Sequence, residues 1–150
     1  MFSLPTWFNK PRTGGAIAST PVHDEPKSVA LLIVEVRADD IERVRALISE
    51  CVNLIGESGG TVFNIVSTLI ICTFDYLNAD FAQAEGRCQK AAEVLRTKLN
   101  THGRVVFGTC EGIYGLFGSE GRFTLGVLVK NMSELLDRLR SVEFGNLERF

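Results

Sequence analysis

Hydrophobic residues follow two patterns along the chain, one typical of strands and the other typical of helices. Residues 29–36 read VALLIVEV, an apolar run that predicts a strand buried on both faces. Asp39 and Glu42 follow with the spacing of a capping box, which marks the start of a helix. Apolar residues then recur every three or four positions until Gly56 ends the helix; they are Ile41, Val44, Ile48, Cys51 and Ile55.

A hairpin and a second helix are predicted next. Residues 59–74, GGTVFNIVSTLIICTF, contain two apolar runs around Ser67 and Thr68, which indicates a strand, a tight reversal and a second strand. The second helix is expected to start near Asn78 and to end before Gly103. Its buried stripe is expected to be Phe81, Ala84, Cys88, Ala91, Leu95 and Leu99.

The last third of the chain has strand-like runs separated by glycine. Residues 104–111 and 112–118 are predicted as two strands, and residues 122–129 are a further candidate strand. A third helix is expected to open at Asn131, with Glu134 at the capping-box position and Leu135, Leu136, Leu139 and Val142 buried. The order β-α-β-β-α-β-β and a last helix predicts an α+β sandwich of the ferredoxin-like kind, one antiparallel-rich sheet with helices on one face.

Residues 1–28 differ from the rest of the chain. They hold all 4 prolines and a Gly-Gly pair and show no sustained period, so we expect a flexible N-terminal arm ahead of a domain at residues 29–150. Phe2, Trp7 and Phe8 lie near the start of this arm. They are either part of a disordered or locally collapsed chain end, or a short docking motif for a partner or a membrane surface.

Composition narrows the class of protein. With 150 residues, 45% of them apolar, the chain can form one compact domain. A net charge of -2 and a pI near 5.7 argue against nucleic-acid binding. No apolar run approaches the roughly 18 residues of a membrane span, and the opening residues lack a secretory signal. The 4 cysteines have no C-x-x-C pairing and the chain has 2 histidines, which predicts reduced core thiols, a cytoplasmic location and no zinc site.

Two ungapped blocks resemble the catalytic domain of class III nucleotidyl cyclases, the adenylate/guanylate cyclase family. Residues 59–74 are similar to the family's Gly-Gly-Thr-Val strand, Gly-Asp hairpin and apolar strand ending in Phe. Residues 104–123, RVVFGTCEGIYGLFGSEGRF, are similar to its strand pair and Gly-Ser loop, and NMSELLDRL to its Asn-x-x-x-Arg helix. The resemblance runs from about Val29 to Leu139.

In that family two domains join head to tail and form a cyclic nucleotide at their interface. Two Asp side chains hold two metal ions, which activate the ribose 3′-hydroxyl and neutralise the triphosphate. The resemblance places Glu35 and Thr68 at these two positions. Because Glu is longer than Asp and Thr is neutral, it implies a metal site that is weakened or absent.

The remaining nucleotide positions of the family also carry different residues here. The adenine-selecting Lys corresponds to Asn64, and its Asp partner to Thr124 or Leu125, depending on where a one-residue gap is placed. The ribose-orienting Asn corresponds to Glu134, and Arg138 keeps the position of the Arg that stabilises the transition state. Taken together, the resemblance implies that these are vestigial nucleotide-site positions, with no catalytic residue, no metal and no cofactor.

Each of these residues also has a structural interpretation. Glu35 can be an ordinary carboxylate at a strand end, and Asn131 with Glu134 can be a helix cap. Asp75 follows the second strand of the hairpin, so we expect it at the far end from the metal position rather than as a replacement ligand. Arg122 and Arg138 are the cations expected nearest to the nucleotide site.

Two classes of function remain. The first is a catalytically degenerate, cyclase-like signalling module that dimerises, or that binds and regulates a partner such as another cyclase-like protein. The alternative is an adenylate or guanylate cyclase, or a nucleotide sensor, with a non-standard site. Changes at four separate roles favour the first class, and the uncharged hairpin favours a homodimer because little charge is desolvated when it is covered.

Overall fold

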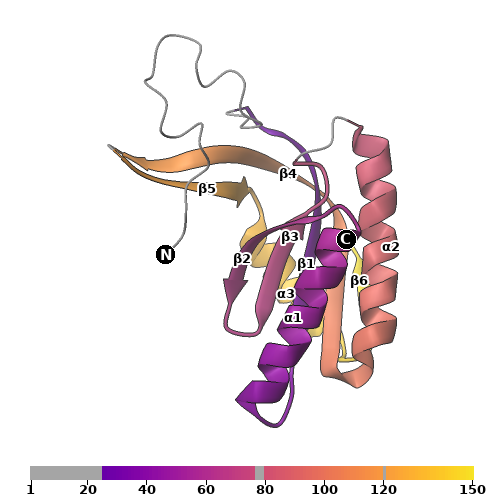
Figure 1. Cartoon of the computed structure of the whole chain (residues 1–150). Helices are drawn as coiled ribbons and strands as arrows, with labels where there is room; N and C mark the ends of the chain where they lie inside the picture. Colours follow the sequence, from indigo (N-terminus) through magenta and orange to yellow (C-terminus); the bar gives the residue numbers. More distant parts are fainter. Residues whose placement is uncertain (1–24, 77–79, 120) are drawn as a thin grey trace.

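The computed structural model describes residues 25–76, 80–119 and 121–150 (Figure 1). Most of the predicted arm, with Phe2, Trp7 and Phe8, lies outside these residues, as does the predicted helix start at Asn78. The elements in chain order are β1 (Lys27–Val36), α1 (Ile41–Glu57), β2 (Thr61–Val66), β3 (Leu69–Thr73), α2 (Phe81–Leu99), a 3₁₀ turn (Asn100–His102), β4 (Gly103–Ser119), β5 (Arg122–Val129), α3 (Met132–Ser141) and β6 (Leu147–Arg149).

A single six-stranded sheet organises the fold, and the predicted α+β class is confirmed. The strand order is β2-β3-β1-β4-β5, and β6 pairs with β4. The first four strands of this order run antiparallel to their neighbours, as in a ferredoxin-like sheet, and β5 continues the pattern. The short β6, which the sequence did not indicate, is parallel to β4.

Helices cover both faces of the sheet, so the expectation of helices on one face is wrong. Alternate residues of β1, such as Leu32 and Val34, are buried in the cluster that contains the inward sides of α1 and α2. Leu31 and Ile33 point the other way and share a cluster with Leu135 and Leu139 of α3. The central strand is therefore apolar on both faces, which explains the unbroken run in its sequence.

The two strands predicted at residues 104–111 and 112–118 are one strand, β4. Its first part pairs with β1 as far as Gly112, which lies opposite Lys27, and its second part pairs with β5 from Gly112 to Ser119. Beyond β1, the paired strands β4 and β5 extend away from the helices as a ribbon (Figure 1). We call Ile113–Ser119 together with Arg122–Leu128 the β4–β5 arm.

Both ends of α1 differ from the prediction. Asp40, not Asp39, caps α1, because its carboxylate accepts a hydrogen bond of 2.8 Å from the Arg43 N–H. Ile41, the first residue of the predicted apolar repeat, begins the helix and is 80% exposed. Gly59, with φ of 88°, takes the place after the helix that was expected for Gly56.

The ends of the other two helices depend on different side chains. Asp80 caps α2 by accepting from the N–H groups of Ala82 and Gln83 at 3.1 and 3.3 Å. Asn131 occupies the N-cap position of α3, but its side chain makes no capping hydrogen bond. The predicted start of α3 at Asn131 is confirmed, but the Asn131 side chain does not cap the helix, whose apolar side is buried through Leu135 and Leu139.

The turn of the β2–β3 hairpin contains a local strain that can be tested. Ser67 has φ of 55°, whereas Thr68 is not among the residues with positive φ. A hairpin turn with positive φ only at its first central position favours glycine there, since other residues pay a steric cost.

We therefore expect Ser67→Gly to stabilise the protein by up to about 1 kcal/mol, measured by urea denaturation. Thr68→Gly is the matched control: at a residue without positive φ, glycine only adds unfolded-state entropy and should destabilise the protein by about 0.5–1 kcal/mol. Equal effects of the two changes would contradict the assignment of strain to Ser67.

Candidate functional site

The two predicted metal positions meet at one end of the sheet. Glu35 lies near the end of β1, in register with Leu69 of β3. Thr68 lies in the turn just before β3, and its carbonyl accepts a hydrogen bond of 3.0 Å from the N–H of Val36. The structure therefore brings the backbones of Glu35 and Thr68 close together, as the resemblance implied.

Asn64 lies on β2 and the two candidates for its partner lie on β5, the strands at the two ends of the strand order. A bulge at Phe63 shifts the β2–β3 register, so Asn64 pairs with Ile71 and is exposed. Leu125 packs in a cluster with Phe63, whereas Thr124 alternates with it along β5 and is exposed. Of the two alternatives for the adenine partner, only Leu125 lies on the face of Phe63, and it is apolar.

Glu35 is bound by an arginine of its own chain. Arg104 lies directly opposite it on β4, and the Arg104 Nε and Nη2 atoms lie 2.6 and 2.5 Å from Glu35 Oε1. Arg104 Nη1 also donates hydrogen bonds of 3.1 Å to the carbonyls of Arg140 and Val142, at the C-terminal end of α3. The guanidinium thus contacts an anion and the negative end of a helix together.

An aromatic ring holds this guanidinium in place. The Arg104 guanidinium carbon lies 4.4 Å from the centre of the Phe144 ring, and that of Arg37 lies 4.0 Å from it. Arg37 Nε in turn donates to the Thr101 carbonyl at 3.1 Å. We call Glu35, Arg104, Phe144 and Arg37 the arginine cluster; only the Glu35 member of it was singled out from the sequence.

The residues at the predicted metal site do not fit two divalent cations. The carboxylate of Glu35 is already neutralised by a cation with 15% side-chain exposure, and Thr68 offers a neutral hydroxyl. Within the described ranges 25–76, 80–119 and 121–150, no group of three His, Cys, Asp or Glu side chains could hold a metal ion. A divalent cation could bind Glu35 in two ways. It would either displace Arg104 or lie beside its guanidinium, where the two positive charges repel each other.

The two positions on α3 are also unsuited to a nucleotide. Arg138 Nη2 lies 2.6 Å from Glu148 Oε1 of β6, with both side chains about two-fifths exposed. Glu134 is exposed on the first turn of the same helix. A phosphate approaching Arg138 therefore competes with Glu148 and meets the negative charge of Glu134.

Asp75 lies at the opposite end of β1 from Glu35, as expected, but it is buried. Its Oδ1 accepts a hydrogen bond of 2.5 Å from the Tyr114 hydroxyl, and Lys27 Nζ lies 3.4 Å from Oδ2. Burial, and next the carboxylate of Asp75, raise the pKa of Tyr114. The rings of Phe63, Tyr76 and Tyr114 pack with centroids 5.0–5.5 Å apart, so this cluster joins the hairpin to the base of the β4–β5 arm.

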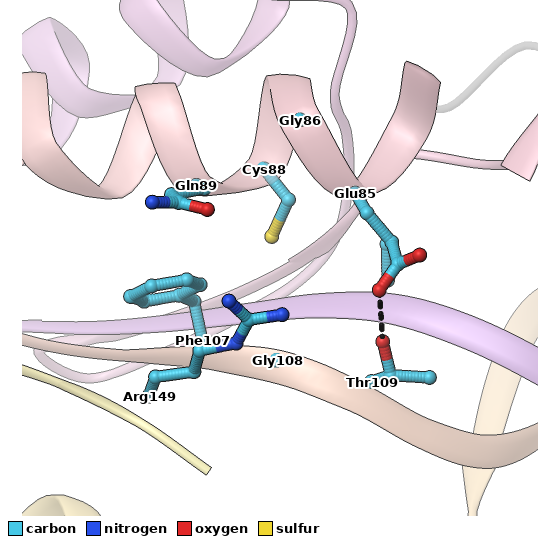
Figure 2. A pocket seen from close by; sticks show the side chains of 9 residues that line it. Glu85, Gly86, Cys88, Gln89, Phe107, Gly108, Thr109 and Arg149 are labelled. Atoms are coloured by element: carbon cyan, nitrogen blue, oxygen red, sulfur yellow. Dashed lines mark hydrogen bonds between the residues drawn. The ribbon is translucent and has the colours of Figure 1, made fainter. Parts of the chain in front are cut away.

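A small cavity of about 160 Å³ lies on the other face of the sheet, between α2 and β4 (Figure 2). Figure 2 shows Glu85 and Gln89 of α2 above it and Phe107, Thr109 and Arg149 below; the Thr109 hydroxyl donates to Glu85 Oε2 at 3.0 Å. Ligand pockets usually measure about 300–1,000 Å³, so a nucleotide does not fit here. The cavity is separate from the site around Glu35.

The sheet order, the helices on its two faces and the hairpin beside Glu35 define the fold of adenylyl and guanylyl cyclase catalytic domains. Within the described residues, no helix is long and apolar enough to cross a membrane. No protein-family model and no curated protein matches the chain.

Individual solved structures share this fold at low sequence identity. The adenylyl cyclase CyaB from P. aeruginosa has a TM-score of 0.70 at 12% identity, over 82% of this chain and 76% of that chain. The guanylate cyclase domain of RhGC from Catenaria anguillulae, in complex with GTP, gives 0.65 at 8% identity, over 82% and 78%. The dimeric guanylyl cyclase domain of RhoGC from the aquatic fungus Blastocladiella emersonii gives 0.58 at 9% identity, over 82% and 79%.

The Glu35–Arg104 pair should make a measurable contribution to stability. We expect Arg104→Met to lower the free energy of unfolding by about 2–3 kcal/mol, because it leaves Glu35 and two carbonyls without their donor in a mostly buried place. A double-mutant cycle with Glu35→Gln, followed by urea denaturation, should give a coupling energy above about 1 kcal/mol.

The exposed pair Asp137–Arg140 is the matched control for this cycle. Its charged atoms lie 3.0 Å apart, but the side chains are 75% and 65% exposed. Solvent screening should therefore limit its coupling to about 0.5 kcal/mol or less. Equal coupling in the two cycles would show that Arg104 is not held specifically by Glu35.

All 4 cysteines are free thiols, and burial protects them. Burial raises the pKa of Cys51 and Cys88 to about 12 and that of Cys110 to about 11, and it also raises the pKa of Cys72.

The raised pKa of Cys110 makes its reactivity depend on pH. At pH 8 only a fraction of ~10⁻³ of the Cys110 side chains is the reactive thiolate. Iodoacetamide labelling of the native protein, followed by mass spectrometry, should modify half-buried Cys110 first, with a rate that rises about tenfold per pH unit above pH 8. Rapid labelling at pH 8 would contradict the burial.

Proposed function

We propose that this protein is a catalytically degenerate, cyclase-like domain that acts as a protein-interaction module in signalling. One observation carries the proposal: Glu35, the one carboxylate at a predicted metal position, is bound by Arg104 of the same chain at 2.5 Å. Cyclase chemistry needs cations that enter with the nucleotide and activate its ribose hydroxyl. Here a fixed guanidinium occupies the carboxylate that would attract them.

The other family positions support the same proposal. Thr68 supplies no charge, Leu125 on the face of Phe63 cannot accept from a base, and Arg138 is paired with Glu148. Each change weakens a contact to the metal ions, the base or the phosphates, and each therefore reduces the stabilisation that the site can give to the transition state. No cofactor is part of this proposal.

The alternative is a cyclase or a nucleotide sensor with a non-standard site. Fold similarity alone favours it, since the structures at TM-scores of 0.65 and 0.70 are cyclases. The arrangement of the arginines disfavours it, because a triphosphate needs cations that are free to bind it. Arg104 is paired with Glu35 and Arg138 with Glu148, and Arg122 lies on the β4–β5 arm, away from Glu35.

The proposed partner is a second copy of this chain or another cyclase-like domain. Val66, at the end of β2, is 53% exposed, and Phe63, Leu69 and Ile71 are half-buried around exposed Asn64. Covering this uncharged surface costs little desolvation energy. The dimeric domain from Blastocladiella emersonii shows that a related fold can form dimers.

The proposal also covers the N-terminal aromatic residues and the cellular compartment. Phe2, Trp7 and Phe8 are proposed as docking residues of a flexible arm, by their aromatic character alone. The free thiols support a reducing compartment, and we propose the cytoplasm.

The proposal predicts that the purified protein forms no cyclic AMP or cyclic GMP from ATP or GTP with Mg²⁺ or Mn²⁺ above a buffer control. Chromatography of the products measures turnover, and calorimetry measures binding of each nucleotide and of Mn²⁺ alone. We expect no heat of binding for Mn²⁺, because its ligand position is occupied by Arg104.

Two variants make this result interpretable. Arg104→Met frees Glu35, and Mn²⁺ binding that appears only in this variant would confirm that the guanidinium blocks the position. Turnover by the unmodified protein that disappears in Glu35→Ala would refute the proposal, since it would demonstrate a working metal site.

A further inference from the structure

The cavity between α2 and β4 exists because small residues face one another across this layer of the fold. Four of the residues that line it carry a small side chain or none; they are Ala30, Gly86, Cys88 and Gly108. Further along α2 the same layer is filled by larger side chains such as Leu95, which is 1% exposed. The space of about 160 Å³ therefore follows from the residues at these positions.

The walls of the cavity are apolar where they are buried and charged where they meet solvent. Cys88 and Phe107 are buried, whereas Glu85 is half-buried and Thr109 and Arg149 are exposed. A cavity of about 150 Å³ can hold benzene, so this one has room for a ligand of about five to eight non-hydrogen atoms. The walls therefore fit a small molecule that has one apolar part and one polar part.

The two charged residues of the cavity have opposite signs, and they come from different elements. Glu85 projects from α2, and its Oε2 accepts a hydrogen bond of 3.0 Å from the Thr109 hydroxyl. Arg149 projects from β6, and Figure 2 shows its guanidinium pointing toward the Cys88 thiol on the helix above. Among the described residues, the Arg149 side chain forms no hydrogen bond or ion pair, with Glu85 or with any other group. The cavity thus presents a free cation and a carboxylate that can accept further hydrogen bonds.

The chemistry of these walls favours a ligand that carries both charges. A simple anion would be attracted by Arg149 and repelled by Glu85, and a simple cation would meet the reverse. An uncharged apolar molecule would remove water from both charged groups without replacing its hydrogen bonds. An α-amino acid carries a carboxylate and an ammonium group on one carbon atom, so it can pair with both residues at once. Its side chain is then directed toward the buried, apolar part of the cavity.

We propose that this cavity binds a small neutral α-amino acid, such as glycine, alanine or serine. The carboxylate of the ligand pairs with the Arg149 guanidinium, its ammonium group donates to Glu85, and its side chain contacts Cys88 and Phe107. The bound ligand links helix α2 to strand β6. This inference goes beyond the proposed function and does not depend on it, because the cavity is separate from the site around Glu35.

Nuclear magnetic resonance of the full chain, labelled with nitrogen-15 and titrated with L-alanine, tests the site directly. We expect saturable shifts of the backbone amide signals of Cys88, Thr109 and Arg149, whereas the signal of Ser67 in the β2–β3 hairpin should not move. Because the ligand has only about six non-hydrogen atoms, its dissociation constant should lie between about 0.1 and 5 mM. Absence of saturable shifts at the three cavity amides up to about four times this upper limit would overturn the proposal.

Three related molecules test which features of the ligand are recognised. Propionate lacks the ammonium group of alanine and ethylamine lacks its carboxylate, so each should bind at least tenfold more weakly than L-alanine. L-Phenylalanine keeps both charged groups but has about twice as many non-hydrogen atoms as alanine, and it should not bind in a cavity of this size. Propionate or ethylamine binding as tightly as L-alanine would overturn the proposal, since the cavity would then recognise a single charge.

Two variants remove the charges that contact the ligand, and a third is their matched control. Arg149→Gln and Glu85→Gln should each raise the dissociation constant for L-alanine at least tenfold. Arg87→Gln removes the same charge as Arg149→Gln, but Arg87 does not line the cavity, and its Cδ lies 3.5 Å from the place of a Cβ on Gly59. Its dissociation constant should therefore stay within about twofold of the unmodified protein. None of the three side chains is buried, so each variant should keep the amide spectrum of a folded protein.

The outcomes separate this inference from the proposed function. Equal weakening by Arg87→Gln and Arg149→Gln would overturn the assigned contacts, because it would reveal a general effect of net charge. Tight binding that survives in both Arg149→Gln and Glu85→Gln would overturn them as well. Neither result bears on the role as an interaction module. Cyclase turnover, in turn, would refute the proposed function and leave the titration with L-alanine standing.

Discussion

The contact between Glu35 and Arg104 determines how the rest of the site is organised. It joins β1 to β4 across one register position, and the same guanidinium reaches two carbonyls at the end of α3. The helix α3, which also contacts the sheet through its apolar side and the Arg138–Glu148 pair, is thereby fixed further by charge-assisted hydrogen bonds. Because the pair is mostly buried, its charges balance one another, and an incoming cation gains little from Glu35.

Much of the fold could be predicted because its signals are local. The unbroken apolar run of β1, the 3.6-residue stripes of α1 and α2 and the paired runs of the hairpin each depend on neighbouring residues alone. The division of β4 was wrong because Gly112 looked like a turn. A Cβ there would lie 3.0 Å from a Val29 methyl and 3.1 Å from the Leu128 carbonyl, so this glycine is required by close packing inside a strand.

At the candidate site the adjacency of two residues was predicted, and the contacts that Glu35 makes were missed. The adjacency of Glu35 and Thr68 followed from a resemblance that preserves strand order, and the structure confirms it. Arg104 was not singled out, because it is 69 residues from Glu35 in the chain and only the β1–β4 register brings the two together. The role of α3 in holding Arg104 also depends on tertiary packing, which periodicity does not report.

The two ends of β4 differ in which of their groups are satisfied within the chain. At the first end, Arg104 neutralises Glu35 within the chain, so the face beside it can be covered without burying an unpaired charge. At the other end, within the described residues, β4 extends beyond its pairing with β1, and Phe117 is 44% exposed there. Internal charge pairing at the first end therefore leaves no unpaired Glu35 charge to be desolvated if the neighbouring uncharged surface is covered.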